Sequence, residues 1–219
     1  MYDYIIIGSG SAGCVVASRL GEDRDVRILV IEAGPPEIDP QIQVPLAFGT
    51  LLKTRYDWDF ASEPEPGLDE RRNYIPRGRV VGGSGSLNAM IYMRGNQADY
   101  DEWAALGFEG WAYDDVLPYF RRSEDNVWGE SVYHGAGGPL TVSNQQSPHA
   151  FTELMIEAAR DAGIPANNDP NGASQEGAGL WQATVRQGRR CSTARSPSKR
   201  IRVTSASVIS STFPCSIAG

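Results

Sequence analysis

Two short apolar runs near the start of the chain predict β-strands on either side of a helix. The run 4–7, Tyr-Ile-Ile-Ile, is rich in β-branched residues, which favour strands. A glycine-rich turn follows, and residues 14–20 then have a composition compatible with a helix. A second apolar run covers residues 27–31. This order predicts a βαβ unit and therefore an α/β fold.

A short helix is predicted over residues 98–106, in the middle of the chain. Gly107 ends it, and Tyr100, Trp103 and Leu106 recur at the spacing of a face that points to the core. We interpret these aromatic residues as packing residues rather than cofactor ligands.

An amphipathic helix is predicted to begin at Ser147, a good N-cap residue, with Pro148 in its first turn. Gly163 marks its end. Its apolar residues recur at helical spacing: Phe151, Leu154, Met155, Ala158 and Ala159. We expect a structural helix here.

The turn after the first strand carries the spacing of a dinucleotide-binding motif. Gly8 permits a tight turn, Gly10 allows the backbone to approach a pyrophosphate, and Gly13 allows the helix to pack on the strand. Glu32 ends the second strand about twenty residues later, where such units place an acid that binds a ribose. Its charge would repel a 2′-phosphate, so the motif favours FAD or NAD over NADP.

A second glycine- and serine-rich segment covers residues 76–95 and runs into an apolar stretch. Small residues and free backbone amides suit a second contact with a phosphate or a flavin ring. Such clusters usually mark plain turns, but the N-terminal motif makes this one informative.

The composition excludes several classes of protein. The 219 residues are 41% hydrophobic and 21% charged, which supports a folded core and excludes a disordered chain. The formal net charge of -7 argues against nucleic acid or an anionic membrane as a partner. Six of the 20 basic residues lie after Gln187, where there is no acidic residue. The chain therefore changes from an acidic to a basic composition near Arg195.

Three cysteines, Cys14, Cys191 and Cys215, form no C-x-x-C pair and fit a reducing compartment. We interpret them as buried or incidental thiols. The sequence has no apolar run long enough to span a membrane, no secretory signal and no cluster of metal ligands, so we expect a cytoplasmic protein without a metal site.

Several motifs together resemble those of the glucose-methanol-choline (GMC) oxidoreductases, a family of FAD-dependent alcohol dehydrogenases and oxidases. The resemblance covers residues 2–195 and is strongest to choline dehydrogenase-like and alcohol dehydrogenase-like members. Its segments are residues 3–14, 32–34, 56–58, 78–92, 99–103, 111–120 and 138–140.

The resemblance implies a Rossmann-like FAD-binding domain followed by an incomplete substrate domain. It implies cofactor contacts in two groups. The first group, at the pyrophosphate, ribose and adenine side, is Gly8, Gly10, Ser11, Ala12, Gly13, Glu32, Ala33 and Trp58. The second group, along the pyrophosphate and the isoalloxazine, is Arg79, Val81, Gly82, Gly83, Asn88, Ala89, Met90 and Ile91.

Two positions depart from the family pattern. Gly85 stands where most members have Ser or Thr, which should loosen the turn without removing backbone donors. Leu87 stands where some relatives carry the His that binds flavin covalently. We therefore expect noncovalent FAD.

The resemblance implies oxidation of a primary alcohol, either choline or another aliphatic or aromatic alcohol, to an aldehyde, with hydride transfer to flavin N5. The electron acceptor, whether oxygen, a quinone or a carrier, stays open. In the family a His from the C-terminal portion is the base, and no residue here matches it. His134 and His149 lie at no triad-like spacing from a carboxylate, and we interpret both as structural or exposed.

The tail leads us to expect a truncated chain. Residues 1–195 correspond to the N-terminal FAD-binding part, with the start of a substrate domain at roughly 99–180, whereas the basic, Ser-rich residues 196–219 are atypical. An adjacent reading frame encoding A-L-E-A-H-P-G-N-L would explain the break as a frameshift. We also expect the parallel sheet to leave apolar residues exposed.

Two other functions stay open from the residues alone. A small nicotinamide-dependent reductase would use the same glycine motif, although the usual Tyr-x-x-x-Lys pair is absent from the sequence. An inactive FAD- or nucleotide-binding fragment would bind FAD without reacting with alcohols.

Overall fold

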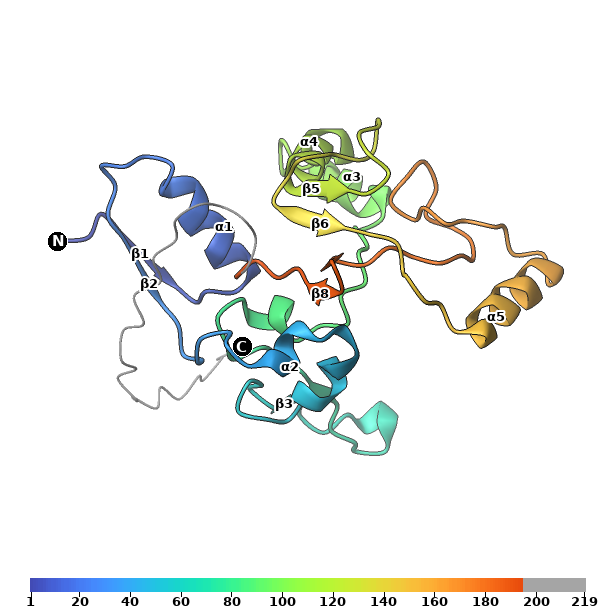
Figure 1. The fold of residues 1–219 in the computed structure, drawn as a ribbon, viewed down its shortest axis with the longest axis horizontal. Helices are drawn as coiled ribbons and strands as arrows, with labels where there is room; N and C mark the ends of the chain where they lie inside the picture. Colours follow the sequence, from blue (N-terminus) through green and yellow to red (C-terminus); the bar gives the residue numbers. More distant parts are fainter. Residues whose placement is uncertain (195–219) are drawn as a thin grey trace.

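The computed structural model describes residues 1–194. Its first unit consists of β1 (Tyr4–Ile7), α1 (Ser11–Leu20) and β2 (Ile28–Ile31). The strands pair in parallel, with Tyr4 opposite Ile28 and Ile7 opposite Ile31, and α1 lies beside them (Figure 1). The predicted βαβ unit is confirmed.

The helix α1 packs closely on this small sheet. Cys14 and Ala17 are its buried residues. A Cβ atom on Gly13 would collide with the carbonyl oxygen of Gly8, so the close packing requires a glycine at position 13. Ile5 and Ile7 are 59% and 86% exposed, as expected for a sheet with few covering elements.

Residues 40–86, which we call the middle region, form several short elements below the βαβ unit in Figure 1. It contains α2 (Pro40–Gln43), the antiparallel strands β3 (Phe60–Ala61) and β4 (Tyr74–Ile75), and three 3-10 helices: η1 (Pro45–Leu51), η2 (Pro66–Leu68) and η3 (Gly83–Ser86). A buried apolar cluster joins α2 and η1 to the segments before η3 and directly after it: Ile42, Leu51, Tyr56, Val80 and Leu87.

The next region contains α3 (Gln97–Ala105), α4 (Tyr113–Ser123) and the parallel strands β5 (Glu124–Asn126) and β6 (Leu140–Val142). The ring of Tyr100 packs against Trp103 and Phe120 at centroid distances of 5.4 and 5.8 Å. The prediction of a packing role for the aromatic residues is confirmed for Tyr100 and for Trp103, whose ring also packs on Trp111. The predicted core-facing position is wrong for Leu106, which is 69% exposed just beyond the end of α3.

The last helix is α5 (Ala150–Asp161), at the far end of the molecule in Figure 1. It begins later than predicted because the Nδ1 atom of His149, not Ser147, accepts the hydrogen bond from the Phe151 amide at 3.1 Å. Leu154 and Met155 are exposed with Phe151, so the apolar face of this amphipathic helix does not pack on the described residues.

A short antiparallel hairpin, β7 (Val185–Arg186) and β8 (Arg189–Arg190), returns the chain to the middle region. Cys14 and Cys191 are buried free thiols, as predicted. Cys215, the atypical tail and its frameshift interpretation lie outside the described residues. Over residues 1–194, no helix combines the length and the apolar character needed to cross a membrane.

Candidate cofactor-binding site

Two glycine-rich turns that are far apart in the sequence meet in the structure. A Cβ atom on Gly83 would lie 2.8 Å from the Cα atom of Gly10, and the Gly82 amide donates to the Ser9 carbonyl at 2.8 Å. Both Gly82 and Gly83 have a positive φ, which favours glycine. The two predicted clusters therefore form one continuous surface.

The N-terminus of α1 opens onto this surface. Its first intrahelical hydrogen bond runs from the Cys14 amide to the Gly10 carbonyl at 2.9 Å, so the amides of residues 11–13 have no partner within the helix. Ser11 and Ala12 are exposed, and the first turn carries no acidic side chain. Free amides and the helix dipole suit a phosphate.

The carboxylate of Glu32 lies against the first glycine turn. One oxygen accepts hydrogen bonds from the amide and the hydroxyl of Ser9, at 2.7 and 2.8 Å, and the other accepts from the Gly34 amide at 2.9 Å. Ala33 follows it on the surface. The predicted position of the acid, at the end of the second strand and beside the glycines, is confirmed, and its role at a ribose stays a prediction.

Arg79 and Trp58 form an exposed pair near Glu32. The guanidinium of Arg79 lies 5.1 Å from the centre of the Trp58 ring, and Trp58 is 42% exposed. A Cβ atom on Gly34 would collide with the backbone of Arg79, and the Val81 amide donates to the Pro35 carbonyl at 3.0 Å. These contacts bring the predicted residues Arg79 and Val81 to the segment that follows Glu32.

The segment from Asn88 to Ile91 continues the surface beyond η3. Asn88, Ala89 and Ile91 are exposed, whereas Met90 is buried with a φ of 62°. The Met90 carbonyl accepts from the Thr184 amide at 2.8 Å. This hydrogen bond holds the backbone of Met90, while the residues on either side of it stay exposed.

Sequence reasoning missed the residue that holds this segment, Arg190. Its guanidinium donates to the backbone oxygen of Asn88 at 2.7 Å and to the side-chain oxygen at 2.8 Å. The sequence offered no signal for this contact, because 102 residues separate the partners.

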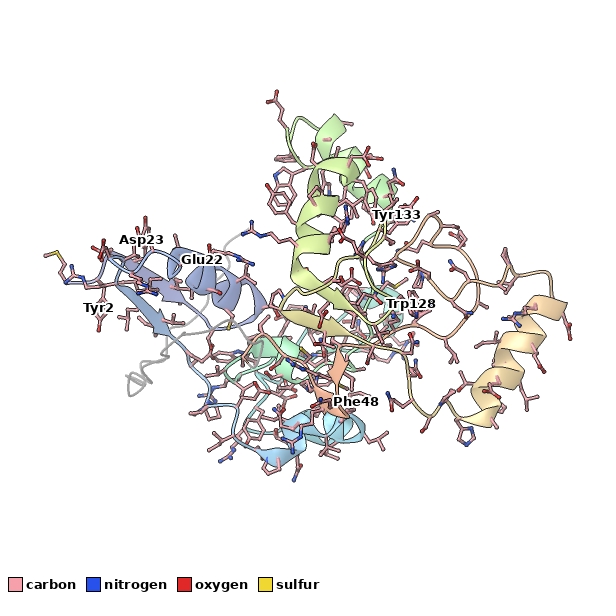
Figure 2. The ribbon with its side chains drawn as sticks, turned by 45° about the horizontal axis from the view of Figure 1, so that its top comes forward. Tyr2, Glu22, Asp23, Phe48, Trp128 and Tyr133 are labelled. Atoms are coloured by element: carbon pink, nitrogen blue, oxygen red, sulfur yellow. The ribbon has the colours of Figure 1, made fainter. Side chains whose placement is uncertain are left out.

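A second polar cluster, which we call the His134 cluster, is buried in the region of α4, β5 and β6. Arg94 forms an ion pair with Glu124 at 2.7 Å, and both side chains are almost fully buried. The His134 ring lies 3.0 Å from Glu124 through Nδ1 and 3.0 Å from Asp169 through Nε2. Trp128, labelled in Figure 2, packs edge-on against His134.

The carboxylates set the protonation of this cluster. The hydrogen bond to Glu124 raises the pKa of His134, and Asp169 adds to this effect. Burial alone would raise the pKa of Glu124, but hydrogen bonds from His134 and Asn126 and attraction to Arg94 hold it below its usual range. His134 is structural, as predicted, but its two carboxylate partners were not predicted because they lie 10 and 35 residues away in the sequence.

A family model described as GMC oxidoreductase matches residues 2–212. The chain belongs to the GMC oxidoreductase family. The match runs past Arg195, and the predicted domain boundary at that residue stays a prediction.

Curated relatives of this GMC chain include two choline dehydrogenases. The mitochondrial choline dehydrogenase of Mus musculus is 46% identical over 201 residues, which cover 88% of this chain and 34% of the relative. The oxygen-dependent choline dehydrogenase of Sinorhizobium fredii is 47% identical over 193 residues, with coverages of 88% and 35%. The chain therefore spans about a third of the length of these relatives.

Solved structures show the same fold. Pyridoxine 4-oxidase from Mesorbium loti superposes with a TM-score of 0.85 at 37% identity, covering 90% of this chain and 39% of that one. An FAD-dependent oxidoreductase from Chaetomium thermophilum gives a TM-score of 0.82 at 34% identity, covering 90% and 36%.

The described residues fit the adenosine and pyrophosphate portion of FAD. The fit rests on the crowded approach of Gly10 and Gly83, which leaves room for backbone but not for a side chain, and on the uncapped start of α1. Glu32 supplies a fixed acceptor beside them. The side chain of Leu87 points into the apolar cluster and offers no atom for a covalent link to flavin.

Proposed function

We propose that this GMC chain binds FAD noncovalently at the surface where its two glycine clusters converge. The observation that carries the proposal is the close approach of Gly10 and Gly83 at the open N-terminus of α1. In this proposal the amides of residues 11–13 bind the pyrophosphate, Glu32 binds the adenosine ribose, and the Trp58–Arg79 pair lies at the adenine side.

We propose that the whole protein oxidises a primary alcohol to an aldehyde. Support comes from the names of the relatives, two choline dehydrogenases and a pyridoxine 4-oxidase. When bound, FAD supplies the hydride acceptor, and the protein supplies position and electrostatics. Choline is our first candidate substrate, and oxygen, a quinone and a carrier are all compatible with the proposal as electron acceptors.

We further propose that the base of this reaction is not among residues 1–194. His134 is 3% exposed and uses both ring nitrogens toward carboxylates, so it cannot reach an alcohol. His149 uses Nδ1 to cap α5.

The free thiols of Cys14 and Cys191 support a reducing compartment, and we propose a cytoplasmic location.

Anaerobic mixing with alcohol tests this division of roles. The full 219-residue chain would be purified, loaded with FAD and mixed with choline in the absence of oxygen while the visible flavin absorbance is recorded. We expect bound oxidised flavin that choline does not bleach. Bleaching by choline would contradict the claim that the base is absent, and failure to load FAD would contradict the binding site.

A further inference from the structure

The guanidinium of Arg190 lies beneath the segment that carries Asn88. Arg190 is only 2% exposed, and its Nη1 atom donates to both oxygens of Asn88, at 2.7 and 2.8 Å, and to the Gly85 carbonyl at 3.3 Å. Its Nε atom donates to the Ile42 carbonyl at 2.9 Å. One side chain on β8 therefore ties α2 to the loop of the second glycine cluster.

These hydrogen bonds set which way the Asn88 amide points. The Oδ1 atom of Asn88 accepts from Arg190 and also from the Met90 amide at 3.1 Å. A carboxamide has one oxygen acceptor and one NH2 donor, so two donors at Oδ1 require the NH2 group to face the other way. Asn88 itself is exposed, and its NH2 group is the donor that it offers to a ligand.

Packing alone does not explain a buried arginine at this position. Burying a charge is costly unless it is paired. The hydrogen-bond acceptors of Arg190 described above are neutral carbonyl and amide oxygens, and the carboxylate of Glu37 supplies the attracting negative charge. Its Nη2 atom is buried without a hydrogen-bond partner among the described residues. Burial lowers the pKa of Arg190 to about 10, against the attraction of Glu37, so the group stays charged at neutral pH. The planar fork of the guanidinium lets one side chain donate to both Asn88 and Ile42.

We propose that Arg190 is a positioning residue for the cofactor, which fixes the Asn88 amide so that its NH2 group faces FAD. This inference rests on the proposed function, because FAD is the group that we expect Asn88 to contact. A merely structural Arg190 would stabilise the fold without affecting what Asn88 presents.

Four variants of the full chain separate these roles: N88D, R190M, the N88D/R190M double variant and R189M. N88D keeps an oxygen for Arg190 and the Met90 amide but replaces the NH2 donor. R189M changes the exposed arginine next to Arg190 on the same strand and is the matched control. The readouts are FAD affinity by quenching of flavin fluorescence, the visible spectrum of the bound flavin, and the thermal unfolding temperature.

We expect N88D to weaken FAD binding by about tenfold, the cost of one hydrogen bond to the ligand, without lowering the unfolding temperature. R190M should weaken binding by at least about tenfold. Because Arg190 acts through Asn88, the double variant should bind FAD no more weakly than the single variant that has the lower FAD affinity. R189M should leave affinity and spectrum unchanged.

Tight FAD binding by N88D, or additive losses in the double variant, would overturn the inference while leaving the proposed function intact. Failure of the unaltered chain to bind FAD would overturn both. If R190M does not fold, the conservative variant R190K takes its place: it keeps the charge but not the planar fork, and we expect it to weaken FAD binding in the presence of Asn88 but not in the N88D background. An equal further loss of FAD affinity in both backgrounds would overturn the inference.

Discussion

Gly83 approaches Gly10 so closely that a Cβ atom on Gly83 would lie 2.8 Å from the Cα atom of Gly10. The contact joins two turns separated by more than seventy residues and defines the proposed phosphate surface. A methyl group at position 83 has no room, because its neighbour is backbone. The positive φ of 57° adds to the cost.

We predict that G83A lowers the unfolding free energy by about 1–3 kcal/mol and weakens FAD binding by more than about tenfold. Urea denaturation and fluorescence titration measure the two effects. Gly129 also has a positive φ, but a Cβ atom added there would meet no heavy atom within 4 Å, so G129A is the control for backbone strain alone. Equal losses of FAD affinity in both variants would argue against the convergence of the turns as the cause.

We predict that E32Q weakens FAD binding by about tenfold, since an amide replaces one of the two acceptor oxygens that a ribose would use. Isothermal titration with FAD checks this. Glu22, an exposed acid beyond α1 that is labelled in Figure 2, provides the control variant E22Q, which should bind FAD like the unaltered chain. Unchanged affinity in E32Q would exclude Glu32 from the site.

Breaking the buried ion pair between Arg94 and Glu124 should be costly. We predict that E124Q lowers the unfolding free energy by about 3–5 kcal/mol, because the guanidinium stays buried without its countercharge. E130Q removes the partner of Arg121 at the surface and should cost less than about 1 kcal/mol. Chemical denaturation measures the free energy of unfolding of both variants. Similar losses in E124Q and E130Q would show that the ion pair between Arg94 and Glu124 is exposed to solvent.

The His134 cluster predicts a pH dependence with two limbs. The pKa of His134 is raised above the unfolded value of 6.5, so its stabilisation is present below that pH and is lost as pH rises through the folded pKa. The pKa of Glu124 is lowered below 4.5, so its stabilisation is present above that pH and is lost as pH falls through the folded pKa. Stability should therefore decline on both sides of a mildly acidic to neutral range.

The variant H134Q assigns the alkaline limb. A glutamine keeps hydrogen-bonding capacity but does not titrate, so the loss of stability above the folded pKa of His134 should become smaller. Urea midpoints measured across the pH range report this change. An alkaline limb of the same size in H134Q would place its origin elsewhere.

Local patterns predicted the parts of the site that local sequence controls. The strand, glycine turn, helix and terminal Glu32 follow from a short stretch of chain, and each lies where the motif predicted. The first turn of α5 was misplaced because the ring nitrogen of His149 competes with Ser147 as a cap. Such competition depends on rotamers that a residue pattern does not report.

Long-range polar contacts escaped prediction for a different reason. Arg190 meets Asn88, and His134 meets Asp169, only after the chain has returned through several turns. A lone histidine and a pair of adjacent arginines carry no periodic signal, and their burial follows from tertiary packing. The sequence marked both glycine segments as candidate cofactor contacts, but the direct approach of Gly83 to Gly10 is seen only in the structure.

The most direct test of this account is a fluorescence titration of FAD with the full chain, in competition with NAD. The account predicts that one FAD binds per chain, that excess NAD does not displace it, and that denaturation releases it intact. Absence of FAD binding, or displacement by NAD at comparable concentrations, would contradict the assignment of the glycine surface as a flavin site.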